Sequence, residues 1–127
     1  MIIKQLSVFL ENRAGRSKEV TCALANAGID ILAFCTADMI EFGVLRIVVS
    51  DIDKAQTILK NAGFATIVTD VLSIVCPNET GALAGLMAKL ADNNISVDYM
   101  YALQQGNQAR AIIRPSDFQK CLSLLQD

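Results

Sequence analysis

Hydrophobic and polar positions follow two spacings along the first part of the chain, one typical of strands and one typical of helices. Residues 2–10 are rich in aliphatic side chains and partly alternate, which predicts a strand. A polar turn follows at 11–15. Beyond it, apolar residues recur at the i, i+3, i+4, i+7 spacing of one helix face, namely Val20, Ala23, Leu24 and Ala27. Gly28 is expected to end this helix.

The same alternation of strand and helix patterns continues to residue 68. Residues 29–37 and 42–49 predict a second and a third strand, with a turn around 38–41 between them. Ser50 or Asp51 is expected to cap a second helix, which Gly63 ends. The apolar face of this helix consists of Ala55, Ile58, Leu59 and Ala62. Residues 64–68 predict a fourth strand.

The chain then repeats itself. When the sequence is shifted by 66 residues, identical residues coincide without a gap at predicted turns, helix faces and caps. The coinciding pairs are Leu6/Leu72, Ser7/Ser73, Asn12/Asn78, Gly15/Gly81, Leu24/Leu90, Ala25/Ala91, Ile29/Ile95, Ile47/Ile113, Ser50/Ser116, Asp51/Asp117, Lys54/Lys120 and Leu59/Leu125. Because these positions carry the local structure, the repeat predicts two units with the same element order.

The second unit is expected to reproduce the elements of the first. Residues 71–76, 95–103 and 108–114 predict strands, and 77–81 predicts a turn. Pro115 is expected to end the last strand, with Ser116 or Asp117 capping the final helix. The helix faces are Leu83, Leu86, Met87 and Leu90 in one helix and Phe118, Cys121, Leu122 and Leu125 in the other.

This order predicts an α+β protein made of two tandem ferredoxin-like βαββαβ units, each an antiparallel sheet with its helices on one face. We expect the units to span residues 1–69 and 70–127. The linker Thr69-Asp70 is so short that the last strand of the first unit could run nearly straight into the first strand of the second.

The second unit is expected to lack its last strand. Asp127 aligns with Asn61, so no residues correspond to the closing strand at 64–68. We expect this to leave the strand at 71–76 as an open apolar edge. Such an edge favours association, and a homodimer is the predicted state. The alternative is an edge that simply frays.

Composition narrows the possible functions. Hydrophobic residues make up 53% of the 127 residues and charged residues 19%, so the chain is expected to fold around a core. The net charge of −2 provides no basic surface for nucleic acid or for an anionic membrane. The four cysteines form no CxxC pair and no signal peptide is visible, which predicts a cytoplasmic protein with reduced thiols.

Catalysis and metal binding are also disfavoured. The chain has no histidine, which excludes histidine bases, catalytic triads and histidine-ligated zinc. The carboxylates are scattered, and several of them are candidates for helix capping. We therefore expect no enzyme, no metal site and no cofactor.

Gly15 and Gly81 occupy equivalent positions immediately before a helix. A glycine there allows a tight turn and the close approach of a ligand, and the following helix start presents unpaired N–H groups to a carboxylate. The alternative is an ordinary turn glycine with no ligand.

The run LSVFLENRAGRSKEV and its repeat LSIVCPNETGALAGL resemble the entry segment of ACT domains. These βαββαβ modules bind amino acids and regulate metabolic enzymes. The family pattern is a strand, then Asp-Arg-Pro-Gly, then a helix. Here Asn takes the place of Asp in both units, and Ala or Thr takes the place of Pro. The resemblance implies a stand-alone tandem ACT protein in which Asn12 and Asn78 supply hydrogen bonds but no charge.

The resemblance also implies where a free amino acid or similar small ligand would bind, at an interface between units or subunits. The turns would hold its charged groups, at Asn12, Arg13, Ala14, Gly15 and Arg16 and at Asn78, Glu79, Thr80, Gly81 and Ala82. The second strands would line its side chain, at Asp30, Ile31 and Leu32 and at Val97, Asp98 and Tyr99.

Two alternatives remain open from the sequence. Tyr99 and Tyr101 lie on one side of a strand, where they could shape a pocket for a larger side chain or simply pack. The whole protein could instead be an assembly module that uses an open sheet edge without any ligand.

Overall fold

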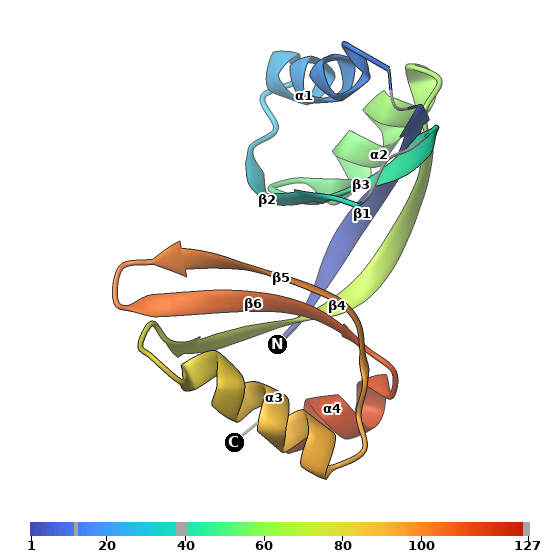
Figure 1. Cartoon of the computed structure of the whole chain (residues 1–127). Helices are drawn as coiled ribbons and strands as arrows, with labels where there is room; N and C mark the ends of the chain where they lie inside the picture. The colour runs from blue at the N-terminus through green and yellow to red at the C-terminus, as the bar shows by residue number, and fades with distance from the viewer. Residues whose placement is uncertain (12, 38–40, 126–127) are drawn as a thin grey trace. The chain divides into compact units, whose positions relative to one another are not determined.

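The computed structural model describes residues 1–11, 13–37 and 41–125, which form two compact units (Figure 1). The N-terminal unit comprises Lys4–Thr69. The C-terminal unit comprises Asp70–Asp127 together with Met1–Ile3. The start of the chain therefore belongs to the unit formed by the end of the chain.

The N-terminal unit has the βαββαβ order that the hydrophobic pattern predicts. Its elements are β1 (Ile2–Glu11), α1 (Arg16–Asn26), β2 (Ile31–Thr36), β3 (Phe42–Val49), α2 (Ile52–Asn61) and the first part of β4 (Ala65–Pro77). The strand order is β2-β3-β1-β4, and β3 pairs antiparallel with both β1 and β2. This is the order of a ferredoxin-like sheet.

The core of this unit lies between the sheet and its two helices. Leu6 lies opposite Ile47 in the antiparallel register, so the two side chains share one sheet face. Leu24 of α1 and Leu59 of α2 belong to the same buried cluster. Both helices thus cover one face of the sheet, as expected from the apolar spacing in each helix.

The C-terminal unit continues the same plan. After β4 it contains α3 (Ala82–Asp92), β5 (Val97–Gln105), β6 (Gln108–Pro115) and α4 (Phe118–Leu125). β6 pairs antiparallel with β4 on one side and with β5 on the other. Leu72, Leu90 and Cys121 are buried together, so α3 and α4 also share one sheet face.

Two predicted core positions are wrong, Ala62, which is exposed where α2 ends, and Leu83. Leu83 lies on α3 but remains 48% exposed, whereas Leu90 on the same helix is 1% exposed. Leu83 is the second residue of the helix, where the apolar spacing continues but the core cluster does not extend. Helical periodicity identifies a face, and only packing decides how far along that face the burial reaches.

The prediction that residues 71–76 form an open edge is wrong, because the start of the chain pairs with this strand at Ser73. The Met1 ammonium donates to the Ser73 carbonyl (3.3 Å), and the Ser73 amide donates to the Met1 carbonyl (2.8 Å). β4 therefore has a neighbour on each side, β1 and β6. The start of β1 therefore lies beside β4 in the C-terminal unit. The edge strands are instead β2 in the N-terminal unit and β5 in the C-terminal unit.

Equivalent hydrogen bonds recur in the two units at the predicted interval. The Ser50 hydroxyl accepts from the Asp30 amide (3.0 Å), and the Ser50 amide donates to the Asp30 carbonyl (3.0 Å). Ser116 and Ser96 form the same pair of bonds, at 3.0 and 2.9 Å. The 66-residue interval of the sequence repeat therefore corresponds to a repeated three-dimensional structure.

The helix caps repeat as well. A carboxylate oxygen of Asp51 accepts from the Lys54 amide at 3.2 Å, and a carboxylate oxygen of Asp117 accepts from the Lys120 amide at 3.0 Å. Both bonds satisfy an amide that a helix start otherwise leaves unpaired. Asp51 and Asp117 are therefore the caps. Ser50 and Ser116 instead bond to the backbone of Asp30 and Ser96, just before β2 and β5.

Candidate functional site

The first glycine turn joins the end of β1 to α1. Gly15 has φ 90° and ψ −11°, a left-handed conformation that side chains rarely adopt. The Arg16 amide donates to the Arg13 carbonyl (3.1 Å), and the Glu19 amide donates to the Gly15 carbonyl (2.9 Å). Among the described residues, no side chain caps α1. Ala14 is exposed, and Asn12 lies outside the described residues.

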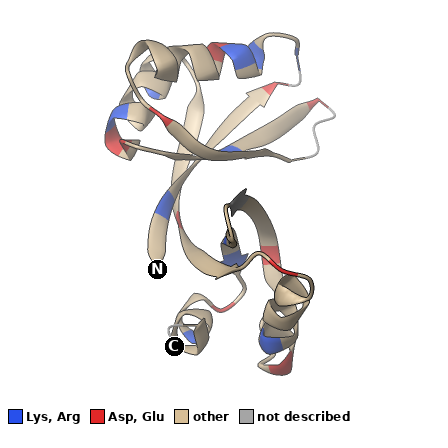
Figure 2. Ribbon diagram, turned by 90° about the vertical axis from the view of Figure 1, so that its left-hand side faces the viewer, with Lys and Arg blue, Asp and Glu red and all other residues tan. Residues whose placement is uncertain are grey.

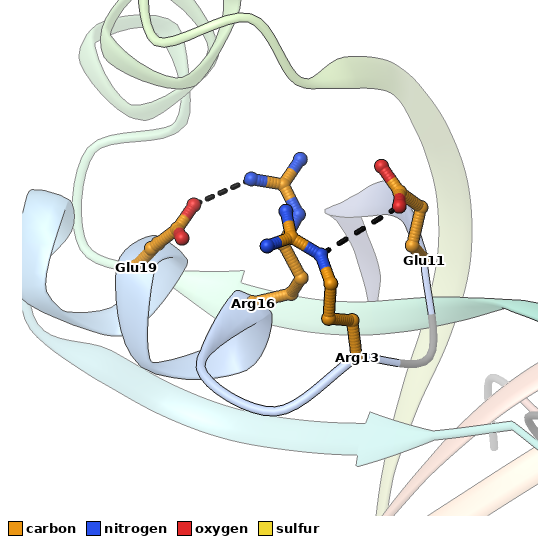
Figure 3. A network of polar contacts seen from close by, with 4 residues as sticks. All are labelled: Glu11, Arg13, Arg16 and Glu19. Atoms are coloured by element: carbon orange, nitrogen blue, oxygen red, sulfur yellow. Dashed lines mark hydrogen bonds and ion pairs between the residues drawn. The ribbon is translucent and has the colours of Figure 1, made fainter.

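Charged side chains surround this turn (Figure 3). Arg13 lies 3.7 Å from Glu11, and an Nη atom of Arg16 lies 2.5 Å from Glu19. The Arg16 guanidinium also lies over the Phe64 ring, 4.4 Å from its centroid. A cation over an aromatic face is attracted by the ring quadrupole. Charged side chains therefore surround the turn, and Arg16 connects it to Phe64, three residues beyond the end of α2.

The second glycine turn has nearly the same backbone. Gly81 has φ 89° and ψ −10°, and no side chain that the structure describes caps α3. The Ala82 amide donates to the Glu79 carbonyl (3.2 Å), and the Gly85 amide donates to the Gly81 carbonyl (2.9 Å). Glu79 and Thr80 are exposed. The equivalent positions predicted from the repeat therefore share one backbone geometry.

Asn78 connects the second turn to the β5–β6 hairpin. Its amide donates to the Asn107 carbonyl at 2.8 Å, and its side-chain amide donates to the Gly106 carbonyl at 3.5 Å. Beside this connection is an open hollow of about 300 Å³, lined by Val75, Cys76, Pro77, Asn107 and Gln108. The second turn thus adjoins space for a small side chain, with apolar and amide groups around it.

The second-strand residues of the N-terminal unit have different environments. Asp30 is exposed, and its backbone binds Ser50. Ile31 packs against the buried core. Leu32 is 59% exposed at a β-bulge, because the register with β3 shifts between Ile31 and Ala33. A bulge redirects the side chain at that point of a strand.

The C-terminal unit repeats the bulge one period later. The register of β5 with β6 shifts between Val97 and Tyr99, which places Asp98 at the bulge. Val97 packs against the core, and Asp98 is exposed. Tyr99 is half-buried and lies opposite Arg114 in the sheet. Shared bulges at Leu32 and Asp98 are a feature that sequence reasoning missed.

The structure does not bring the turns and the second strands of one unit together. Gly15 precedes α1 and Asp30 follows it, so they lie at opposite ends of an 11-residue helix (Figure 1). Such a helix is about 16 Å long, several times the span of one extended residue. The same holds for Gly81 and Val97 across α3. One amino acid therefore cannot contact both sets within a single unit.

Sequence reasoning also missed the partners of the turn residues. Arg16 and Glu19 are three residues apart on one helix, a spacing at which opposite charges meet. The sequence alone could therefore have predicted this ion pair. The contact with Phe64 could not be predicted, because Phe64 is distant in sequence and its ring reaches Arg16 only through the fold. The contact of Asn78 with Asn107 likewise depends on hairpin geometry.

Candidate catalytic groups are sparse. Within the described ranges, His, Cys, Asp and Glu side chains form no group of three that could hold a metal ion. Burial raises the pKa of the Cys121 thiol, and the Asp117 carboxylate raises it further, so the thiol stays protonated at neutral pH. Basic and acidic residues occur together on the helices of both units (Figure 2). Over the same part of the chain, no helix combines the length and apolar character needed to cross a bilayer.

The structure thus contains two ferredoxin-like units, each with a glycine turn before its first helix. The chain matches the sequence profile of the ACT domain pair over residues 1–125 and belongs to this family. The resemblance stated from the turn motifs is thereby confirmed.

Solved structures support the same fold. The crystal structure of protein BT0572 from Bacteroides thetaiotaomicron is 46% identical, with a TM-score of 0.95, and the match covers 99% of this chain and 88% of that one. The regulatory subunit of aspartate kinase from Thermus thermophilus is 15% identical, with a TM-score of 0.71 and coverage of 99% and 93%. The corresponding subunit from Thermus flavus is 14% identical, with a TM-score of 0.64 and coverage of 99% and 94%. Comparison with curated proteins gave no match.

Proposed function

We propose that the protein is a non-catalytic, cytoplasmic regulatory module that binds a free amino acid at its glycine turns. The observation that carries the proposal is the pair of equivalent helix starts, at Gly15 and Gly81, where no described side chain serves as a cap. Uncapped amides and the positive end of the helix dipole favour a carboxylate. The four free cysteines are in keeping with a reducing compartment.

By the sequence repeat, one ACT unit spans residues 1–69 and the other 70–127, each with its own turn, and Met1–Ile3 of the first repeat pack with the second unit. The turn residues would hold the carboxylate and ammonium groups of the ligand, with Asn12 and Asn78 as hydrogen-bonding partners. Aspartate kinase regulatory subunits with the same fold support a regulatory role. The second-strand residues are not part of this ligand contact within one unit, because α1 and α3 separate them from the turns.

Calorimetric titration with each of the twenty common amino acids tests this function. At least one is expected to bind the folded protein with measurable heat. Ala14→Glu and Thr80→Glu each place a carboxylate beside one turn, and the variant at an occupied turn is expected to weaken binding at least tenfold by charge repulsion. Ala25→Glu, on the exposed side of α1, is the matched control and is expected to bind normally. Absence of heat with every amino acid would overturn the proposal.

We also propose that the protein is a homodimer that associates through the edge of β2. Leu32 is 59% exposed and Phe34 is 68% exposed on this edge strand. Edge strands present unpaired backbone groups, and apolar side chains beside them favour pairing with a second chain.

Light scattering coupled to size-exclusion chromatography checks the homodimer. The wild-type protein is expected to have twice the mass of one chain at micromolar concentration, and Phe34→Glu is expected to yield monomers. Ile67→Glu, at a position that is 52% exposed on β4, is the control and should remain dimeric. A wild-type monomer would contradict the proposal.

A further inference from the structure

The two glycine turns have the same backbone but different side-chain chemistry. Gly15 and Gly81 agree within about a degree in φ and ψ, and both turns close through the same pair of amide hydrogen bonds. At the equivalent side-chain positions, however, Arg13 corresponds to Glu79 and Arg16 to Ala82. At these two positions the first turn therefore carries two cations, whereas the second turn carries one anion and one uncharged residue.

The two arginine side chains extend to the same side of the first turn (Figure 3). Arg16 is held firmly, since its side chain is only 19% exposed and its guanidinium lies on Phe64. The Arg13 side chain is 60% exposed and lies 3.7 Å from Glu11. The turn thus carries one largely buried cation and one largely exposed cation on the same side.

The start of α1 also carries positive potential. Two guanidinium groups on one side of the turn add to the positive end of the helix dipole. Glu11 and Glu19 each pair with one arginine, but both carboxylates are about half exposed, where solvent weakens an ion pair. A further anion on this side of the turn is therefore favoured.

A specific donor also lacks a partner. The Nε atom of Arg16 is buried and has no hydrogen-bond acceptor among the described residues, while an Nη atom is taken by Glu19. Buried polar groups are nearly always paired, so this N–H group calls for an acceptor that the described residues do not supply, and either a water molecule or a ligand can provide it. A carboxylate suits a guanidinium particularly well, because it can accept two parallel hydrogen bonds.

We infer that the first turn selects an amino acid with a second carboxylate, such as glutamate or aspartate, and that the second turn does not. The inference rests on the proposed amino-acid binding. The backbone amides at the helix start take one carboxylate, as in both turns. The arginine pair takes the other, with Arg13 closing over it and Arg16 donating from Nε. In the second turn, Glu79 repels a second carboxylate.

Calorimetric competition between L-glutamate and L-glutamine tests the selectivity, with L-aspartate and L-asparagine as a second pair. The wild-type protein is expected to bind each acid at least tenfold more tightly than its amide, and this ratio is expected to fall as salt is raised. Arg16→Gln and Arg13→Gln are each expected to bring the ratio close to one while glutamine still binds. Lys18→Gln removes one charge from an exposed position on the same helix and is expected to leave the ratio unchanged.

The outcomes separate the two proposals. Equal binding of acid and amide by the wild-type protein would overturn the selectivity but leave amino-acid binding intact, as would a ratio that survives in both arginine variants. Absence of binding by any amino acid would overturn both. Because Arg16 contacts Phe64, circular dichroism must show that its variant is folded; Arg13, which is mostly exposed, provides the second variant.

Discussion

Leu24→Ala is expected to lower the free energy of unfolding by about 2–5 kcal/mol, and Leu90→Ala by a similar amount. Leu24 is fully buried between α1 and the sheet of the N-terminal unit, and Leu90 is 1% exposed at the equivalent position of α3. Truncation removes the burial energy of three carbon atoms and leaves a cavity that close-packed neighbours fill only partly. Urea unfolding followed by circular dichroism measures the change.

Leu83→Ala is the control for this pair. The residue type and the helix are the same as for Leu90, but the side chain is 48% exposed and outside the core cluster. The expected loss is below about 0.5 kcal/mol, as for most surface positions. A loss comparable to that of Leu90→Ala would show that the periodic face of α3 is buried to its first turn, contrary to the structure.

Gly15→Ala and Gly81→Ala are each expected to lower the free energy of unfolding by about 1–2 kcal/mol. No heavy atom would clash with the added Cβ at either position, so the cost comes from the left-handed backbone, with φ near 90°. Gly85→Ala is expected to change stability in the opposite direction, by about 0.5–1 kcal/mol, because Gly85 lies inside α3 with ordinary dihedral angles and open space around it.

Thermal and urea unfolding of the three variants measure these effects on one chain. The comparison is matched, since all three replace an exposed glycine with alanine and differ in backbone conformation. A stabilising Gly81→Ala would contradict the left-handed helix start on which the candidate site depends. A destabilising Gly85→Ala would contradict the helical assignment of that position.

Most of the secondary structure was predictable, because each helix buries a stripe and each strand buries a face. The spacing of Ala55 and Leu59 predicted α2, and both are buried in the core. The repeat predicted equivalent caps, and Asp51 and Asp117 make equivalent hydrogen bonds. These features are local, so they depend on residues within one or two turns of the chain.

The candidate site was predictable only in part. The glycine turns follow from local sequence, because few other residues accept the required φ. The grouping of the turns with the second strands was suggested by the family resemblance, and α1 separates the two sets within one unit. The β-bulges at Leu32 and Asp98 have no clear local signal, since a bulge is a property of two paired strands.

The sequence by itself determined two equivalent α+β units, their helix faces and caps, and the two glycine turns, because short-range periodicity and backbone preference set all of these. Only the tertiary structure decided that Met1 pairs with Ser73 beside β4, and that Arg16 rests on Phe64 with an unpaired Nε atom. Both contacts join residues far apart in the chain. Their partners are set by how strands and helices pack, and no local pattern encodes that choice.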